Sequence, residues 1–182
     1  MKHTIAIILT VVALAAPAAS AQIKWNNIAT ADTATLGERL VFIDFYTSWC
    51  GWCKKMDRET FTDPTVAKIM TRYYYPVKFD AESGLTFSWK GTSYKGNQPV
   101  NGRQRPHEFA YAILGQRMGF PSYGIFDSDR NLVNVLPGYY SAKDFTILLW
   151  YFASGDYKKY AYERYQQIFD SEIRPEMEKL LK

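Results

Sequence analysis

The sequence predicts a three-layer α/β fold in which a mixed central sheet is flanked by helices, and three observations predict it. Two strand-like runs rich in β-branched and aromatic residues, 40–46 and 74–79, are separated by segments of helix-forming composition. This order is typical of two parallel strands joined by a helical crossover. Two further runs, 122–126 and 132–136, are joined by a short polar turn, the pattern of an antiparallel hairpin. The length of 182 residues suits one globular domain.

The first 21 residues have the pattern of a cleavable signal peptide. A short basic start precedes an apolar run over residues 5–16, and residues 19–21, Ala-Ser-Ala, match the small residues that signal peptidase requires. The alternative is a membrane anchor, but so short a run cannot cross a hydrocarbon core that needs roughly 20 residues. We therefore expect an exported protein, periplasmic in a Gram-negative bacterium and secreted otherwise, with a mature domain over residues 22–182.

The first core strand and the helices after it follow from local sequence. Residues 40–46 form a mostly apolar run, as expected for a strand buried on both faces. Residues 54–59 have helix-forming composition. Asp63 then precedes Pro64, which is a capping residue followed by proline at the first helical position. This pair predicts a second helix that ends at about residue 72.

After the second core strand the composition changes. Residues 81–105 are rich in Gly, Ser, Asn, Gln and Lys, which predicts an insertion whose regular content is at most a small hairpin. Trp89 lies inside this stretch and is expected either to fill its own loop or to join a docking surface. A helix is predicted from Pro106 to about Met118, ahead of the antiparallel hairpin.

The C-terminal part is predicted to be helical. Ser141 caps a helix that ends at about residue 153, with Asp144 in a capping-box position. Residues 157–182 are charged and amphipathic and form a helical extension that Pro175 interrupts. The extension packs either on its own sheet or on another chain. Four residues are expected to share its buried face: Ala161, Tyr165, Ile168 and Phe169.

Composition and charge exclude several classes of protein. Apolar residues make up 47% of the chain and charged residues 22%, which excludes the poorly hydrophobic, highly charged class that stays disordered. The 22 basic and 18 acidic residues give a net charge of +4 and no clustered basic face, so no nucleic-acid partner is expected. Beyond the N-terminal run, the richest apolar stretch, residues 145–152, is too short to span a membrane.

The chain contains two cysteines, Cys50 and Cys53, and they carry the predicted chemistry. At a strand-to-helix junction the first sulfur meets free backbone N–H groups and the positive end of the helix dipole, which favour a thiolate. The thiolate is the attacking species in disulfide exchange. We therefore expect Cys50 to attack a partner's disulfide and Cys53 to resolve the mixed disulfide.

The cysteine pair has three alternative explanations. A structural zinc site needs four ligands, and the mature chain adds only His107, so no metal is expected. A purely structural disulfide across so short a loop adds little stability. Free thiols are oxidised outside the cell. A redox-active Cys50–Cys53 disulfide remains the favoured interpretation.

The eleven residues from Asp44 to Lys54, Asp-Phe-Tyr-Thr-Ser-Trp-Cys-Gly-Trp-Cys-Lys, resemble the active-site segment of the thioredoxin superfamily. The order of elements agrees over residues 40–152. This resemblance implies a thioredoxin-like fold and an exported thiol–disulfide oxidoreductase that needs no cofactor. It also implies that Asp44 assists proton transfer at the resolving thiol, that Lys78 lies near this acid, and that Pro121 is a cis-proline facing the disulfide.

Each of these three residues also has a simpler explanation. Asp44 could be a hydrogen-bonded acid at the end of a strand, since a charged and unpaired carboxylate in an apolar strand is costly. Lys78 could be a surface lysine whose stem lies along apolar side chains. Pro121 could be an ordinary trans proline at the start of a strand.

The segment also departs from the family pattern. The dipeptide between the cysteines is Gly-Trp rather than Gly-Pro, and it contains no histidine. Together with Asp44, this favours a reductase of disulfides in other exported proteins, kept reduced by a membrane electron donor. Trp49, Trp52 and the bulky Phe120 are expected to form the substrate-docking surface. Three other functions remain open: a disulfide isomerase, a cytochrome c maturation reductase, and a peptide-binding module in which the cysteines are incidental.

Overall fold

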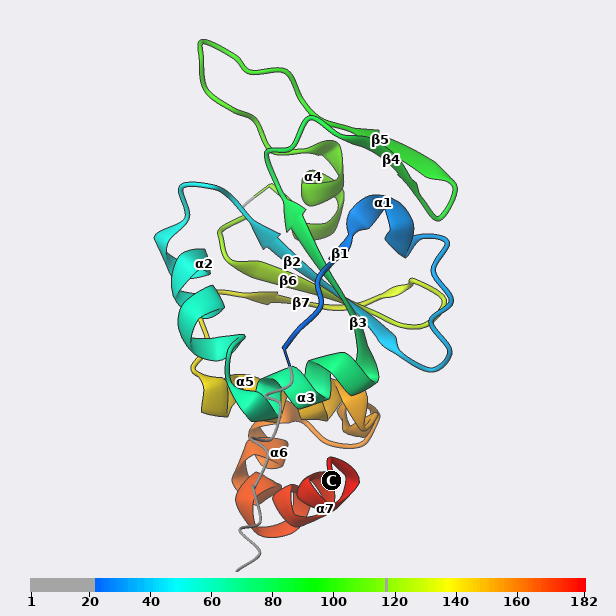
Figure 1. The fold of residues 1–182 in the computed structure, drawn as a ribbon, viewed down its shortest axis with the longest axis vertical. Coiled ribbons are helices and arrows are strands. Elements are labelled where there is room, and N and C mark those ends of the chain that lie inside the picture. The colour runs from blue at the N-terminus through cyan, green and yellow to red at the C-terminus, as the bar shows by residue number, and fades with distance from the viewer. Residues whose placement is uncertain (1–21, 117) are drawn as a thin grey trace, which may run out of the picture.

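The computed structural model describes residues 22–116 and 118–182 and has the α/β architecture that the sequence predicts (Figure 1). The signal-peptide prediction concerns residues 1–21 and lies outside the described residues. The strands of the central mixed sheet are β1 (Asn26–Asn27), β2 (Leu40–Tyr46), β3 (Tyr74–Asp80), β6 (Ser122–Phe126) and β7 (Leu132–Pro137). They lie in the order β1-β3-β2-β6-β7.

Strand β2 occupies the centre of this sheet. It runs parallel to β3, as the helical crossover predicts, and antiparallel to β6, which forms the expected hairpin with β7. The register places Asp44 opposite Lys78 of β3 and Phe45 opposite Ser122 of β6. The residues that follow β2 therefore leave the sheet beside the start of β6.

Helices cover both faces of the sheet and create two hydrophobic cores (Figure 1). They are α1 (Ile28–Ala31), α2 (Gly51–Lys55), α3 (Pro64–Tyr73), α4 (Glu108–Leu114), α5 (Ala142–Ala153), α6 (Tyr162–Ile168) and α7 (Arg174–Leu180). One core joins α3 and α5 to Phe42 of β2, and the other joins α1 and α4 to Phe45. Because side chains alternate across a strand, neighbouring residues of β2 enter opposite cores. The predicted three-layer arrangement is confirmed.

Helix α3 begins at the capping residue that the sequence predicts. The side-chain oxygen Oδ1 of Asp63 accepts the backbone N–H groups of Thr65 at 2.9 Å and Val66 at 3.0 Å. Pro64 occupies the first turn, where its missing N–H costs nothing. The same side of the helix then buries Val66 and its apolar neighbours against the sheet.

Replacing Asp63 with alanine is expected to lower the free energy of unfolding by about 1 kcal/mol, because two N–H groups lose their acceptor. Urea unfolding of the oxidised protein measures this loss. The matched control is Lys68→Ala, at an exposed position of the same helix, where a change within about 0.5 kcal/mol is expected. Equal losses in the two variants would contradict the assigned cap.

The insertion over residues 81–105 contains the small hairpin that the sequence predicts; it lies beside α1 in the upper part of Figure 1, and the loop from the hairpin to α4 projects beyond it. Trp89 is buried, with its ring centroid 5.5 Å from Phe109 and 5.1 Å from Phe126. It therefore packs beneath its own loop and does not join a docking surface. The two strands of the hairpin are β4 (Thr86–Trp89) and β5 (Thr92–Lys95).

The helix predicted over residues 106–118 is shorter at both ends. His107 caps α4, because its Nδ1 accepts the N–H of Phe109 at 3.0 Å. At the other end Gly115 has a φ angle of 76°, a left-handed conformation that glycine adopts at little cost and that ends the helix. The composition of the stretch indicated a helix, but these two residues set its limits.

The C-terminal extension packs on the chain's own helices. Tyr165 of α6 meets Tyr151 of α5 at a ring-centroid distance of 4.8 Å, and it belongs to the core that α5 shares with the sheet. Among the described residues, none of the helices is long and apolar enough to cross a membrane.

Two predictions about this extension are wrong. Pro175 lies in the first turn of α7, where a helix tolerates proline, so it does not interrupt a helix. The irregularity is instead the π-helical segment Phe169–Ile173 between α6 and α7. Ala161 is the exposed N-cap of α6 and does not share the buried face, which Tyr165 and Ile168 form together with Phe169.

Candidate active site

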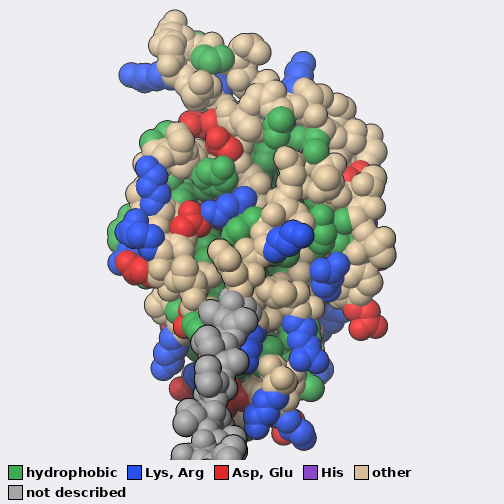
Figure 2. All heavy atoms as spheres, in the orientation of Figure 1, with side chains coloured by type: hydrophobic (Ala, Val, Ile, Leu, Met, Phe, Trp, Pro, Cys, Tyr) green, Lys and Arg blue, Asp and Glu red, His purple; other side chains and the backbone are tan. Residues whose placement is uncertain are grey.

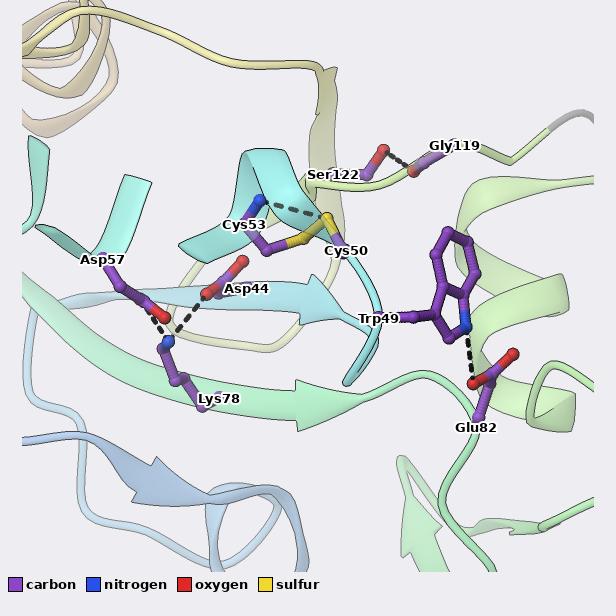
Figure 3. The surroundings of a disulfide bond; sticks show 9 residues. All are labelled: Asp44, Trp49, Cys50, Cys53, Asp57, Lys78, Glu82, Gly119 and Ser122. Carbon is purple, nitrogen blue, oxygen red and sulfur yellow. Dashed lines mark hydrogen bonds and ion pairs between the residues drawn. A yellow bond between two sulfur atoms is a disulfide. The ribbon is translucent and has the colours of Figure 1, made fainter. Parts of the chain in front are cut away.

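The two cysteines form a disulfide at the start of α2 (Figure 3). Cys50 is the N-cap of the helix, and its Sγ accepts the backbone N–H of Cys53 at 3.0 Å. Their exposed fractions are only 2% for Cys50 and 4% for Cys53. An N–H group of the first helical turn therefore points at the first sulfur, and in the reduced protein the same N–H can stabilise a thiolate there.

Helix α2 continues directly into a π-helical segment, Met56–Thr60. Such segments are rare and frequent at functional sites. Thr60 attaches this segment to the loop between β7 and α5, because its hydroxyl donates to the carbonyl of Tyr140 at 2.7 Å. It carries Asp57, whose carboxylate meets Lys78 of β3. The π-helical segment thus brings an acidic side chain to the underside of the redox helix.

Asp44 lies buried beneath the redox helix, with an exposed fraction of 2%. Its Oδ2 is 3.6 Å from the Nζ of Lys78, while its buried Oδ1 has no hydrogen-bond partner. Figure 3 shows the side chain between Lys78 and the part of the helix that carries Cys53. Burial raises the pKa of Asp44 to about 7; Lys78 opposes this rise, and the negative charge of Asp57 adds to it.

Lys78 reaches Asp44 through an aromatic enclosure. Its Nζ lies 5.2 Å from the ring centroid of Tyr46, 5.3 Å from that of Trp25 and 5.9 Å from that of Phe61. Rings at these distances attract a cation through their faces. The ammonium group is therefore held among three aromatic rings.

The loop before β6 lies beside the redox loop. The Phe120–Pro121 peptide bond is cis, as the resemblance implies. Because Ser122 pairs with Phe45 of β2, this loop emerges at the end of the sheet from which the Cys50 loop also emerges. The hydroxyl of Ser122 donates to the carbonyl of Gly119 at 2.7 Å and closes the turn.

Two exposed tryptophans flank the disulfide. Trp49 has an exposed fraction of 65% and Trp52 of 57%. Trp49 packs edge-on against Phe120 at a centroid distance of 6.2 Å, and its indole N–H donates to Glu82 at 3.0 Å. Trp52 meets Tyr139 at 5.4 Å. The structure thus brings the three predicted docking residues, Trp49, Trp52 and Phe120, to the rim of the site.

Three residues of this site, Asp57, Glu82 and Tyr139, are not among those that the sequence predicts. Asp57 follows Cys53 by four positions, a spacing that places two side chains on one side of a helix, so the pattern could have indicated it. Glu82 and Tyr139 meet the tryptophans only through the tertiary fold. Each lies in a segment without a motif, and no sequence signal points to either.

In the described part of the chain, no three His, Cys, Asp or Glu side chains lie close enough together to hold a metal ion. His107 is buried and engaged elsewhere: its Nε2 lies 2.9 Å from the carbonyl of Leu85, and its Nδ1 caps α4. The two sulfurs of the redox site, which could otherwise be metal ligands, are joined to each other in the Cys50–Cys53 disulfide.

Solved structures with this fold include several thiol–disulfide proteins. A DsbH oxidoreductase is 18% identical, with a TM-score of 0.50 over 76% of this chain and 90% of that one. A thioredoxin-fold protein from Helicobacter pylori is 13% identical, with a TM-score of 0.55 over 81% and 89%. A disulphide-isomerase candidate from Bacteroides thetaiotaomicron is 21% identical, with a TM-score of 0.50 over 74% and 95%. At these identities the likeness establishes the fold.

The family follows from the sequence itself. A comparison with curated proteins finds no match. The model of the thioredoxin-like domain matches residues 27–153, well over half of the chain, and this stretch includes both cysteines, Asp44, Lys78 and Pro121. The chain therefore belongs to the thioredoxin-like domain family, and it carries a CxxC disulfide at a strand-to-helix junction.

Proposed function

We propose that this protein is exported and reduces disulfides in other exported proteins. The observation that carries the proposal is the Cys50–Cys53 disulfide at the start of a helix, above a buried carboxylate with a pKa near neutrality. A nucleophilic sulfur, a resolving sulfur and a proton acceptor are the three groups that thiol–disulfide exchange needs.

The reaction starts from the reduced protein. The thiolate of Cys50 attacks one sulfur of the substrate disulfide, and the other substrate sulfur leaves as a thiolate. Asp44 then takes the proton of the Cys53 thiol, and the Cys53 thiolate attacks the mixed disulfide at Cys50. The second substrate sulfur leaves, and two electrons have passed to the substrate. The product is the Cys50–Cys53 disulfide, which is the state of this structure.

Substrate docking is assigned to the exposed rim of the site. Trp49 and Trp52 offer apolar surface on either side of the disulfide, and Phe120 extends it toward the cis-proline loop. Pro121 is assigned to the contact with an extended substrate strand, as the family resemblance implies. The substrates are disulfide-containing exported proteins. After each cycle, a membrane protein with a redox-active thiol pair reduces the Cys50–Cys53 disulfide again.

Export is supported by the N-terminal sequence pattern, and the direction by the dipeptide between the cysteines. Gly51 and Trp52 provide no cationic side chain that would stabilise the thiolate further. Without that stabilisation the reduced form is the stronger reductant.

The equilibrium between the Cys50–Cys53 pair and glutathione tests the direction. A reductase is expected to have a reduction potential near the roughly −270 mV of thioredoxin, and reduction of insulin disulfides by catalytic amounts of the protein should follow. A potential near the roughly −120 mV of a strong oxidant would contradict the proposal and assign the protein to disulfide formation instead.

Disulfide isomerisation is the second candidate function. It is supported by the similarity in fold to the Bacteroides thetaiotaomicron protein and by the projecting β4–β5 insertion, where Leu85 is 47% exposed. An isomerase restores activity to a protein whose disulfides have been scrambled, whereas a simple reductase only opens them. Refolding of such a scrambled substrate therefore separates the two functions.

A further inference from the structure

Lys78 is shared between two carboxylates of very different surroundings. Its Nζ donates a direct hydrogen bond to Oδ1 of Asp57, while Oδ2 of Asp44 lies 3.6 Å away, beyond hydrogen-bond distance. The side chain of Asp57 is 41% exposed and that of Asp44 only 2%. The lysine is therefore hydrogen-bonded to the accessible acid and paired with the buried one through charge alone; Figure 3 marks both contacts with dashed lines.

A cavity connects this ion pair to solvent. It has a volume of about 500 Å³, and both Asp57 and Lys78 line it together with Trp25 and Phe61. Figure 2 shows the acidic and basic side chains that reach the surface on this side of the molecule. Asp44 does not line the cavity. The cavity therefore reaches Lys78 but stops short of the buried carboxylate of Asp44. Asp57 holds the ammonium group of Lys78 at the inner wall of the cavity.

Two effects of Asp57 on Asp44 have the same sign. Its negative charge repels a charge on Asp44, and its hydrogen bond draws the ammonium group toward the cavity and away from Asp44. Both disfavour the ionised form of the buried acid. A carboxylate that accepts a proton near neutral pH is the form that the resolving step requires, since a strongly acidic carboxylate takes up no proton from a thiol.

We propose that Asp57 is a positioning residue for the redox reaction: by holding Lys78 at the solvent-facing cavity, it keeps Asp44 a competent proton acceptor for Cys53. The inference rests on the proposed function for its consequence in catalysis. The proton passes from Sγ of Cys53 to Asp44, which becomes a neutral carboxylic acid, and it then leaves to water on the Lys78 side. Asp57 touches neither the substrate nor the sulfurs.

The charged and titratable groups around Asp44 come from five elements. Tyr46 follows on the same strand, Lys78 lies on β3, and Tyr123 faces Asp44 from β6. Asp57 faces it from the π-helical segment, and the cysteines of α2 do not titrate in the oxidised protein. Lys78 is the cation of this set and Asp57 its second carboxylate, while the pKa of each tyrosine is raised, which keeps the phenols neutral. Replacing Asp57 therefore removes one negative charge near Asp44 and weakens the competing hold on Lys78, and it leaves the other groups in place.

The experiment follows the ¹³C resonance of the Asp44 carboxyl group against pH in the oxidised protein. In Asp57→Asn the amide oxygen still accepts a hydrogen bond but carries no charge, so it holds Lys78 less strongly and no longer repels a charge on Asp44. The titration midpoint of Asp44 is therefore expected to fall by about one pH unit or more. Asp57→Glu keeps the charge and is expected to restore the wild-type midpoint. Asp129→Asn removes the same charge from an exposed turn and is expected to leave the midpoint unchanged.

An unchanged or higher midpoint in Asp57→Asn would overturn the inference. The pH profile of insulin reduction is the second measurement, and its Asp44-dependent limb should shift to lower pH in Asp57→Asn alone. A wild-type protein that fails to reduce any disulfide would contradict the proposed function, while the carboxyl titration would still decide the role of Asp57. The two failures are therefore distinguishable.

Discussion

Replacing Cys50 with serine is expected to reduce turnover of a protein disulfide by about a thousandfold or more, to the background rate. The hydroxyl of serine is not ionised at neutral pH, so the variant has no nucleophile at the N-cap of α2. Insulin reduction with a chemical reductant as electron source measures the rate. An unimpaired Cys50→Ser variant would contradict the assignment of Cys50 as the nucleophile.

Cys53→Ser is the matched variant, and it should fail differently. Cys50 still attacks the substrate, but nothing resolves the mixed disulfide, so a covalent complex with the substrate should accumulate. Non-reducing gel electrophoresis and mass spectrometry detect this complex. If Cys50→Ser formed the complex and Cys53→Ser did not, the roles of the two sulfurs would be exchanged.

Replacing Asp44 with asparagine is expected to change both the rate and the stability. The resolving step loses its proton acceptor, and an effect of at least about tenfold on turnover is expected, since a general base contributes roughly 10²–10⁴. The amide has nearly the shape of the carboxyl group, so the strand and its two neighbours should be unaffected. Rapid mixing of the reduced protein with substrate measures the rate of the resolving step directly.

The effect on stability has a definite sign. The pKa of Asp44 is about 7 in the folded protein and 3.8 as its ordinary value. Between these pH values the folded protein holds a proton that the unfolded chain has released, so stability falls as the pH rises through this window. Asp44→Asn removes the penalty, and we expect a gain on the order of 2–4 kcal/mol at pH 8 and almost none at pH 3.5.

Urea unfolding of the oxidised protein at the two pH values tests this result. The control is Asp129→Asn, which removes a carboxylate from an exposed turn and should alter stability little at either pH. A gain of equal size at both pH values would mean that Asp44 is not the group that titrates.

The central fold could be predicted from the sequence because its signals are local. The mostly apolar run of residues 40–46 indicates a buried strand, and Asp63 with Pro64 fixes a helix start by a contact between near neighbours in the chain. The predicted helix over 106–118 failed for the complementary reason. Its ends depend on the imidazole of His107 and on the φ angle of Gly115, which composition does not determine.

Residues of the site could be predicted where they lie in the family motif or at a fixed spacing from it along the chain. The two cysteines lie in one motif, and Asp44 precedes them at a fixed spacing on the adjoining strand. Lys78 required the register of β2 and β3, which the resemblance supplied. Tyr139 is brought to Trp52 by the packing of the loop after β7, a contact between residues 87 positions apart in sequence, and no periodicity of either segment carries that information.

The separation of the two cores by the sheet has a consequence for how this protein can diversify. Phe42 and the α3–α5 layer support the side of β2 on which Asp44 and the redox helix lie, whereas Phe45 and the α4 layer support the β4–β5 hairpin. A change in the length or composition of the hairpin therefore affects the packing of a core to which neither Asp44 nor the redox helix belongs. The hairpin is therefore the segment at which a new recognition surface can be introduced without altering the reaction centre.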